Sequence, residues 1–195
     1  MTAEVEQLLS QVRACRICEA HLPLGPRPVV QAAANSRLLI VSQAPGRKVH
    51  DTGIPFNDPS GDRLREWMGI DKTIFYDPEQ IAIVPMGFCY PGKGKSGDLP
   101  PRPECAPTWH PRLLPLLTEV RLTLVIGQYA HKGLLGNTRC RTLTETVKAW
   151  QNYTVDGYLP LPHPSPRNLM WLRRNAWFET DLLPELRRRV TAALT

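Results

Sequence analysis

The sequence predicts an α/β protein built on a mainly parallel β-sheet with helices on both faces. Three short apolar runs, at residues 37–42, 81–84 and 122–127, lack the polar alternation of a half-exposed strand. Uninterrupted apolar strands are typical of sheets that are buried on both sides. Segments with helical periodicity separate these runs, and strands that alternate with helices indicate the crossover connections of parallel sheets.

Helices are expected where apolar residues recur with a period near 3.6. Residues 2–14 begin the chain as a helix, because four apolar residues starting at Val5 are spaced i, i+3, i+4 and i+7. Residues 60–68 form the next helix, with Ser60 or Asp62 as its N-cap. The remaining helices are expected at residues 108–118, 128–135, 142–150, 169–176 and 180–194.

A fourth, weaker strand is expected over residues 158–162, where two prolines restrict it to a sheet edge or a strand end. Two unusual loops follow strands, at residues 42–46 and 163–168. Ligands bind beyond the carboxyl ends of parallel strands, so we expect these loops to meet there. The irregular segment 87–107 is long for a compact domain, which indicates a function or a structural tie.

Length and composition limit the kind of protein. The chain has 195 residues, a net charge of +6 and 42% hydrophobic residues, which suits a single domain over residues 1–195 with a substantial core. No apolar run approaches the roughly 18 residues of a membrane span, and residues 1–14 show no secretory signal. We therefore expect a cytoplasmic monomer with no membrane partner. The basic charge permits a polyanionic partner and does not establish one.

Four of the five cysteines form two pairs. Cys15 and Cys18 make a CxxC pair, and Cys89 and Cys105 lie in the irregular segment with 15 residues between them. In a reducing compartment such pairs favour a metal over a disulfide framework, and thiolates suit zinc or an iron–sulfur cluster. Unpaired structural cysteines are the alternative, and the spacing leaves both open. Cys140 stands alone.

Three motifs together resemble one known family. The first comprises residues 42–46 (SQAPG), residues 52–56 (TGIPF) after a five-residue gap, and Ser60-Gly61. The second is the HPSP sequence at residues 163–166, and the third is the two cysteine pairs. In this order they are similar to the uracil-DNA glycosylase superfamily, and closest to its family-4 iron–sulfur type, over roughly residues 12–180.

The resemblance implies a fold and a cofactor. The fold is a three-layer α/β/α sandwich with a central four-stranded, mainly parallel sheet. The cofactor is a 4Fe–4S cluster held by Cys15, Cys18, Cys89 and Cys105, which would pin the N-terminal helix and the 89–105 loop beside the DNA-facing surface. A chain that holds zinc, or that has kept the thiols and lost the cluster, is the alternative. The implied partner is single- or double-stranded DNA.

The resemblance also implies a DNA-repair glycosylase that removes uracil or a related deaminated base after flipping it out of the stack. Cleavage leaves negative charge on the departing base, so catalysis needs donors aimed at that charge. His163 is the expected donor. The Ala44-Pro45-Gly46 turn is expected to bring backbone N–H groups close to the base, and Phe56 is expected to stack on it.

The first motif departs from the family pattern where water would be activated. Gln43 stands where family-4 members carry Glu, and an amide can hydrogen-bond but cannot act as a base. Ala44 stands where family-1 members carry a catalytic Asp. The nearest carboxylates are Asp51 and Asp58, and the candidates for positioning water are Asp51 and its neighbour His50, with ordinary turn residues as the alternative.

Base recognition and DNA contacts also differ from the pattern. The uracil-reading Asn after the second strand is absent, so Asn57 or Asn168 would read the base. Arg167 follows HPSP where family-1 members carry an apolar wedge, and it can stack or bind phosphate. Ser165 and Asn168 are expected to bind phosphates, and Arg173 to extend the basic surface. These departures keep a second function open, that of a diverged member that binds nucleic acid without efficient base excision.

Overall fold

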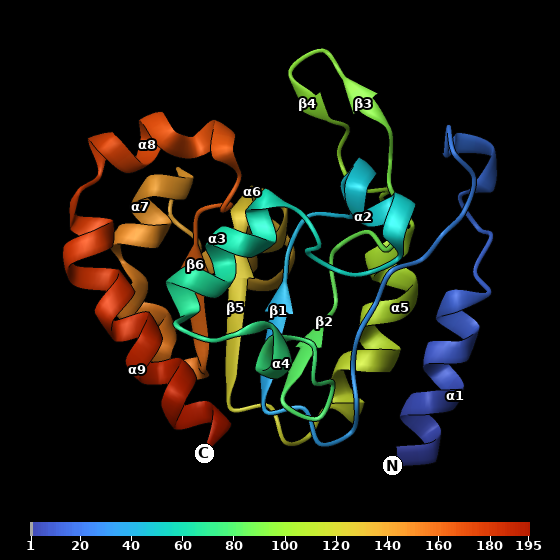
Figure 1. The fold of residues 1–195 in the computed structure, drawn as a ribbon, viewed down its shortest axis with the longest axis horizontal. Helices are drawn as coiled ribbons and strands as arrows, with labels where there is room; N and C mark the ends of the chain where they lie inside the picture. Colours follow the sequence, from blue (N-terminus) through green and yellow to red (C-terminus); the bar gives the residue numbers. More distant parts are fainter. Residues whose placement is uncertain (1) are drawn as a thin grey trace.

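A four-stranded parallel sheet forms the centre of the computed structural model, which describes residues 2–195 (Figure 1). The strands are β1 (Leu38–Val41), β2 (Ile81–Ile83), β5 (Leu122–Ile126) and β6 (Tyr158–Leu161), in the order β2-β1-β5-β6. Every neighbouring pair is parallel, and Leu38 of β1 lies opposite Ile81 on one side and Leu122 on the other. The predicted sheet is confirmed, and it is wholly parallel.

Both faces of the sheet are buried under helices, as the apolar strands predict. Along β1, Leu38 and Ile40 pack into one hydrophobic core, while Leu39 and Val41 pack into the other. Helices α3 (Pro59–Met68), α4 (Lys72–Phe75), α7 (Leu143–Lys148), α8 (Leu169–Arg174) and α9 (Leu183–Leu194) contribute to the first core. Helices α1 (Thr2–Arg13), α5 (Cys105–Leu113) and α6 (Gly127–Ala130) contribute to the second, so the architecture is α/β/α.

The two outer strands of the sheet, β6 and β2, differ in what lies beside them. Strand β6 is an edge strand, which agrees with the restriction that Pro160 and Pro162 place on it. The other edge, at β2, is covered by an antiparallel bridge in which Gln31 and Ile83 exchange backbone hydrogen bonds of 3.1 and 2.6 Å. Covered edges prevent pairing with another chain.

Two predicted helices, α3 and α5, need correction at their ends. The N-cap of α3 is Asp58, whose carboxylate accepts the Gly61 N–H at 2.9 Å, and not Ser60 or Asp62. Pro59 then occupies the first turn, where its missing N–H costs nothing. Helix α5 begins at Cys105 and ends at Leu113, so it lies earlier in the chain than residues 108–118.

Several short elements escaped prediction because they are too short to show a period. They are α2 (Arg47–Thr52), α4, and a hairpin of β3 (Lys93–Gly94) and β4 (Gly97–Asp98). The hairpin lies within the irregular 87–107 segment and projects beyond the carboxyl end of the sheet, above α2 (Figure 1). Over residues 2–195, none of the helices has both the length and the apolar character that a bilayer crossing requires.

Candidate functional site

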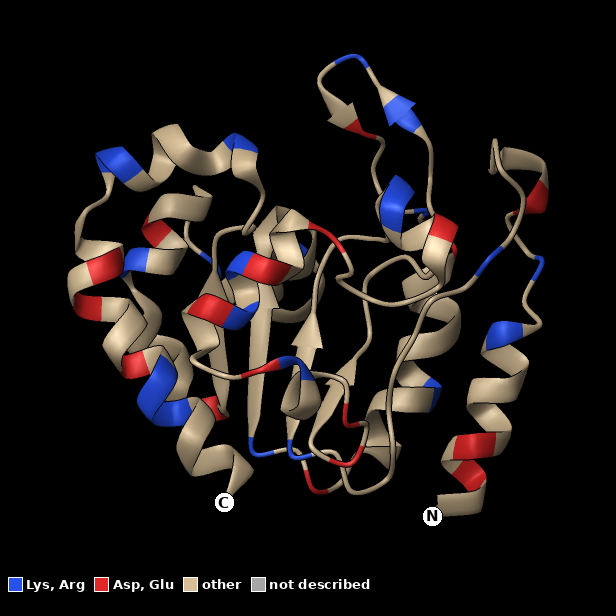
Figure 2. Ribbon diagram, in the orientation of Figure 1, with Lys and Arg blue, Asp and Glu red and all other residues tan. Residues whose placement is uncertain are grey.

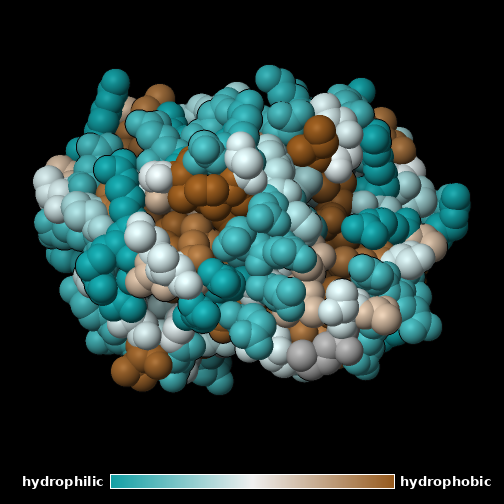
Figure 3. Space-filling model, turned by 60° about the horizontal axis from the view of Figure 1, so that its bottom comes forward, coloured by the Kyte–Doolittle hydropathy of each residue, from teal (hydrophilic) through white to brown (hydrophobic). Residues whose placement is uncertain are grey.

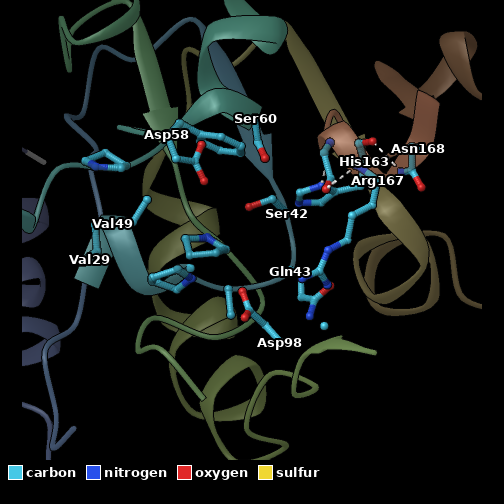
Figure 4. A pocket seen from close by; sticks show the side chains of 18 of the residues that line it. Val29, Ser42, Gln43, Val49, Asp58, Ser60, Asp98, His163, Arg167 and Asn168 are labelled. Atoms are coloured by element: carbon cyan, nitrogen blue, oxygen red, sulfur yellow. Dashed lines mark hydrogen bonds between the residues drawn. The ribbon is translucent and has the colours of Figure 1, made fainter. Parts of the chain in front are cut away.

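A cavity of about 530 Å³ opens at the carboxyl ends of the strands (Figure 4). Each strand contributes to its wall through the segment that follows it: Ser42 after β1, Pro85 after β2, Gln128 after β5 and His163 after β6. Loops 42–46 and 163–168 meet there, which confirms that expectation. Nine of the expected site residues line the cavity, namely Gln43, Ala44, Pro45, Gly46, Phe56, His163, Ser165, Arg167 and Asn168.

The imidazole of His163 is held in one orientation. Its Nδ1 accepts a hydrogen bond from the Ser165 N–H at 3.2 Å, and its carbonyl accepts one from Asn168 Nδ2 at 2.7 Å. Burial lowers the pKa of His163, and the nearby Asp58 carboxylate partly opposes this shift. In the neutral ring, an accepting Nδ1 leaves the proton on Nε2. The ring therefore presents Nε2–H as a donor that is not engaged by residues 2–195.

The turn after β1 is fixed by the β2 side of the sheet. The carbonyls of Ser42 and Gln43 accept the N–H groups of Met86 and Gly87 at 2.8 and 2.9 Å. Within the described chain, the N–H groups of Ala44 and Gly46 bond to no protein acceptor, so they remain available to a ligand. The side chain of Gln43 does not point at a reacting group, because its Nε2 donates to the Leu99 carbonyl at 3.2 Å.

Phe56 forms an apolar part of the wall from an unusual backbone conformation. Its φ of 53° lies in the left-handed region, which non-glycine residues rarely adopt. The buried Arg65 donates to the Phe56 carbonyl at 3.4 Å, and the Phe75 ring packs edge-on against the Phe56 ring at 6.0 Å. Gly61 leaves the space that this carbonyl occupies. Phe56 of the TGIPF sequence and Gly61 of the Ser60-Gly61 pair thus pack against each other and fix this part of the cavity wall.

Three of the expected catalytic and base-binding residues do not line the cavity: His50, Asp51 and Asn57. In helix α2, Val49 faces the cavity, and successive helical residues are turned about 100° from one another. His50 is buried near the Tyr90 ring, at 6.1 Å between centroids, and burial lowers its pKa. Asp51 is exposed and pairs with Arg47 at 2.9 Å. This placement removes the basis for a water-positioning role of His50 or Asp51.

Two carboxylates that were assigned no site role from the sequence line the cavity instead, Asp58 and Asp98 (Figure 4). An Asp directly before Pro59 is a recognisable helix start, so an N-cap at Asp58 could have been predicted. Asp98 lies in the β3–β4 hairpin, whose sequence carries no period and no turn signal that would place it at the cavity.

The four paired cysteines surround a second, small and mainly apolar cavity. Cys15 follows α1, Cys18 lies three residues on, Cys89 follows β2, and Cys105 begins α5. Burial and the neighbouring cysteines raise the pKa of Cys89 to about 11 and that of Cys105 to about 12, against opposing backbone hydrogen bonds. All the cysteines are free thiols. As arranged in residues 2–195, no three His, Cys, Asp or Glu side chains are positioned to hold a metal ion.

The expected DNA-contacting residues lie on the edge of the molecule that carries the cavity. Arg167 donates to the Ser96 carbonyl of the hairpin at 3.1 Å, and Ser165 caps the turn Pro166–Asn168. Arg173 is exposed on α8. Basic residues of the hairpin, α2 and α8 lie along this same edge (Figure 2). Such a distribution suits a phosphate backbone.

Fold and cavity together define an α/β protein that binds its ligand at the carboxyl edge of a parallel sheet. The family model for the Uracil DNA glycosylase superfamily matches residues 29–187, so the chain belongs to that superfamily. Members of this superfamily act on DNA.

Proposed function

We propose that this protein is a DNA-repair glycosylase that hydrolyses the N-glycosidic bond of uracil or a related deaminated base. The observation that carries the proposal is His163, which presents an unengaged Nε2–H to the cavity and has Nδ1 fixed by Ser165. A hydrogen bond from this group to the departing base stabilises the negative charge that forms as the bond breaks. The free N–H groups of Ala44 and Gly46 add two further donors on the same wall.

The cavity also suits a flipped nucleotide. A volume of about 530 Å³ falls within the roughly 300–1,000 Å³ of small-molecule sites. Phe56 supplies an aromatic surface for the base, and base stacking on an aromatic ring is insensitive to base identity. Asn168 lines the cavity, but its amide nitrogen is bound to the His163 carbonyl. Its role is therefore to hold the histidine loop, while its amide oxygen is left for a ligand.

Base release tests this function directly. Purified protein is incubated with fluorescent oligonucleotides that carry one uracil, hypoxanthine or xanthine, in single- and double-stranded form, and abasic sites are then cleaved with alkali. We expect strand cleavage at one or more of these bases and none in the undamaged oligonucleotide. Failure to release any of the three bases from protein that is folded and loaded with its cofactor would reject the proposal.

A second candidate is a diverged member that binds DNA without efficient excision. Its support is that the first motif supplies no base, since Gln43 is bound to Leu99 and neither His50 nor Asp51 lines the cavity. It predicts DNA binding that weakens steeply with salt in the absence of base release. Binding that is insensitive to salt, or no binding, would contradict this second candidate.

We also propose that Cys15, Cys18, Cys89 and Cys105 hold a 4Fe–4S cluster. The support is the donor set, because four thiols from three segments surround one apolar cavity. Cys15, Cys18 and Cys89 lie near enough to Cys105 to raise its pKa, and cysteine thiolates are the usual ligands of iron–sulfur clusters. When bound, the cluster would supply a structural link between α1, the 87–105 segment and α5, with no step of the hydrolysis assigned to it.

Replacing Cys105 by alanine is expected to abolish cluster binding, because each thiolate is a direct ligand. The measurement is the visible absorption spectrum together with the iron content and melting temperature of each purified variant. Cys140→Ala is the matched control, since Cys140 lies near Tyr153 and away from the cysteine cavity. If the wild-type protein is brown and Cys105→Ala keeps this colour, the assignment is contradicted. If the wild-type protein is colourless and contains stoichiometric zinc, the four cysteines hold zinc and not a cluster.

A further inference from the structure

Two carboxylates from distant parts of the chain approach the same point of the cavity wall. A methyl group on Gly46 would lie 3.5 Å from Asp98 Oδ2 and 3.9 Å from Asp58 Oδ2. Gly46 belongs to the turn after β1, Asp58 precedes α3, and Asp98 ends the hairpin. Both oxygens therefore border the same small space beside Gly46.

The two carboxylates differ in what they already bind. Asp58 Oδ1 accepts the Gly61 N–H at 2.9 Å as a helix cap, so Oδ2 is the oxygen that remains for the cavity. The carboxylate of Asp98 forms no hydrogen bond and no ion pair within residues 2–195, and Arg167 and Lys93 act on it only through their charge. Of the two, Asp98 is the one free to exchange a proton with a ligand.

Asp98 is brought to the cavity by contacts from both sequence motifs. Gln43 donates to the Leu99 carbonyl at 3.2 Å, directly after Asp98, and Arg167 donates to the Ser96 carbonyl at 3.1 Å, two residues before it. The amide of Gln43 cannot act as a base, but it fixes the segment that carries a carboxylate.

Hydrolysis of a glycosidic bond needs a group that accepts a proton from water. Gln43 and Ala44 cannot do so, and His163 is committed through Nδ1 to Ser165 and through Nε2 to the departing base. Asp58 and Asp98 are the acidic residues that line the cavity in the described chain. We propose that Asp98 orients the attacking water and accepts its proton, with Asp58 as the second oxygen acceptor that holds this water beside Gly46.

The step balances in atoms and charge. The water oxygen bonds to the anomeric carbon of the sugar, and the bond from that carbon to the base nitrogen breaks with its electron pair on the base. One water proton goes to Asp98, which returns it to solvent, and the base anion takes a proton from solvent after it leaves His163. This assignment rests on the proposed glycosylase function.

The pH dependence supplies a second readout. Partial burial raises the pKa of Asp98, and the negative charge of Asp58 raises it further. The positive charges of Arg167 and Lys93 lower this pKa. Tyr90 also lies near the Asp98 carboxylate. A base must be unprotonated, so the rate should rise with pH as Asp98 loses its proton. Replacing Asp98 by Asn should remove this dependence and leave only the one contributed by His163.

The test compares Asp98→Asn with Asp51→Asn in single-turnover base release. We expect Asp98→Asn to lower the rate about 100-fold or more, while Asp51→Asn, an exposed carboxylate outside the cavity, stays within about twofold of wild type. Affinity is measured with an oligonucleotide that carries 2′-fluorinated deoxyuridine, whose glycosidic bond resists hydrolysis. Asp98→Asn should bind it as the wild type does.

The outcomes separate this proposal from the one on which it rests. Wild-type release with an unchanged rate in Asp98→Asn would overturn the role of Asp98 and leave the glycosylase function intact. A loss of affinity equal to the loss of rate would make Asp98 a DNA contact and would also overturn its role. A wild-type protein that releases no base would overturn both proposals together.

Discussion

Replacing His163 by alanine is expected to lower base release by about 10²- to 10³-fold, the usual cost of losing one donor to a developing anion. The ring is the donor whose orientation is best fixed, because Ser165 holds Nδ1 and Asn168 holds the backbone carbonyl. Alanine removes Nε2–H and, because its side chain is smaller, enlarges the cavity. The measurement is the single-turnover rate on a uracil oligonucleotide, with enzyme in excess.

The conservative variant and the pH profile make this result specific. His163→Gln retains an N–H donor at nearly the same reach, so it should recover part of the lost rate. Burial lowers the pKa of His163, so the ring is neutral at neutral pH. As pH falls through that lowered pKa, protonation removes the acceptor for the Ser165 N–H, and the wild-type rate should fall. An alanine variant as fast as wild type would remove His163 from the mechanism.

Replacing Gly61 by alanine is expected to destabilise the fold by about 3 kcal/mol or more. The added methyl group would lie 1.7 Å from the Phe56 carbonyl oxygen, which is a collision with backbone. Alanine is intrinsically favoured over glycine inside a helix by about 1 kcal/mol. The collision is the larger effect, because Phe56 is held in a left-handed conformation and α3 is anchored by its buried Leu64, Trp67 and Met68.

The loss of stability is measured as the shift in the urea midpoint, with Gly133→Ala as the matched control. A methyl group on Gly133 would meet only the end of the flexible Met86 side chain, at 2.3 Å from its terminal carbon, and that side chain can move. We expect the control to change the free energy of unfolding far less than Gly61→Ala does. Equal midpoints for Gly61→Ala and wild type would contradict the contact between Gly61 and Phe56.

Figure 3, in which the bottom of Figure 1 is turned forward, shows hydrophobic patches among mostly hydrophilic side chains. At the other end of the sheet, where α8 lies (Figure 1), Leu169 and Met170 are exposed apolar side chains at the start of that helix. They lie two and three residues after Arg167, which donates a hydrogen bond to the Ser96 carbonyl of the hairpin. Exposed apolar side chains therefore lie close in sequence to Arg167, which is expected to contact DNA.

The sheet, its direction and its buried faces could be predicted from the sequence. Each strand is a continuous apolar run, which is typical of a sheet buried on both faces. Successive side chains of a strand point to opposite faces of the sheet, so alternate residues pack into the two opposite cores. The meeting of the 42–46 and 163–168 loops followed from the same reasoning, because parallel strands present their carboxyl ends at one edge. Short helices such as α2 gave no signal, since six residues hold fewer than two turns.

The sequence by itself determined the sheet and the cavity edge, because these depend on local patterns of burial and on turns within a few residues. The residues His163 and Phe56 were identified through the motifs that resemble a known family. Only the tertiary structure decided which carboxylates face the cavity. The rotation of α2 turned His50 and Asp51 away from it, while the helix cap Asp58 and the hairpin residue Asp98 came together beside Gly46. The path of a loop without periodicity is set by its contacts with other segments, here Gln43 to Leu99 and Arg167 to Ser96, and no local pattern records those contacts.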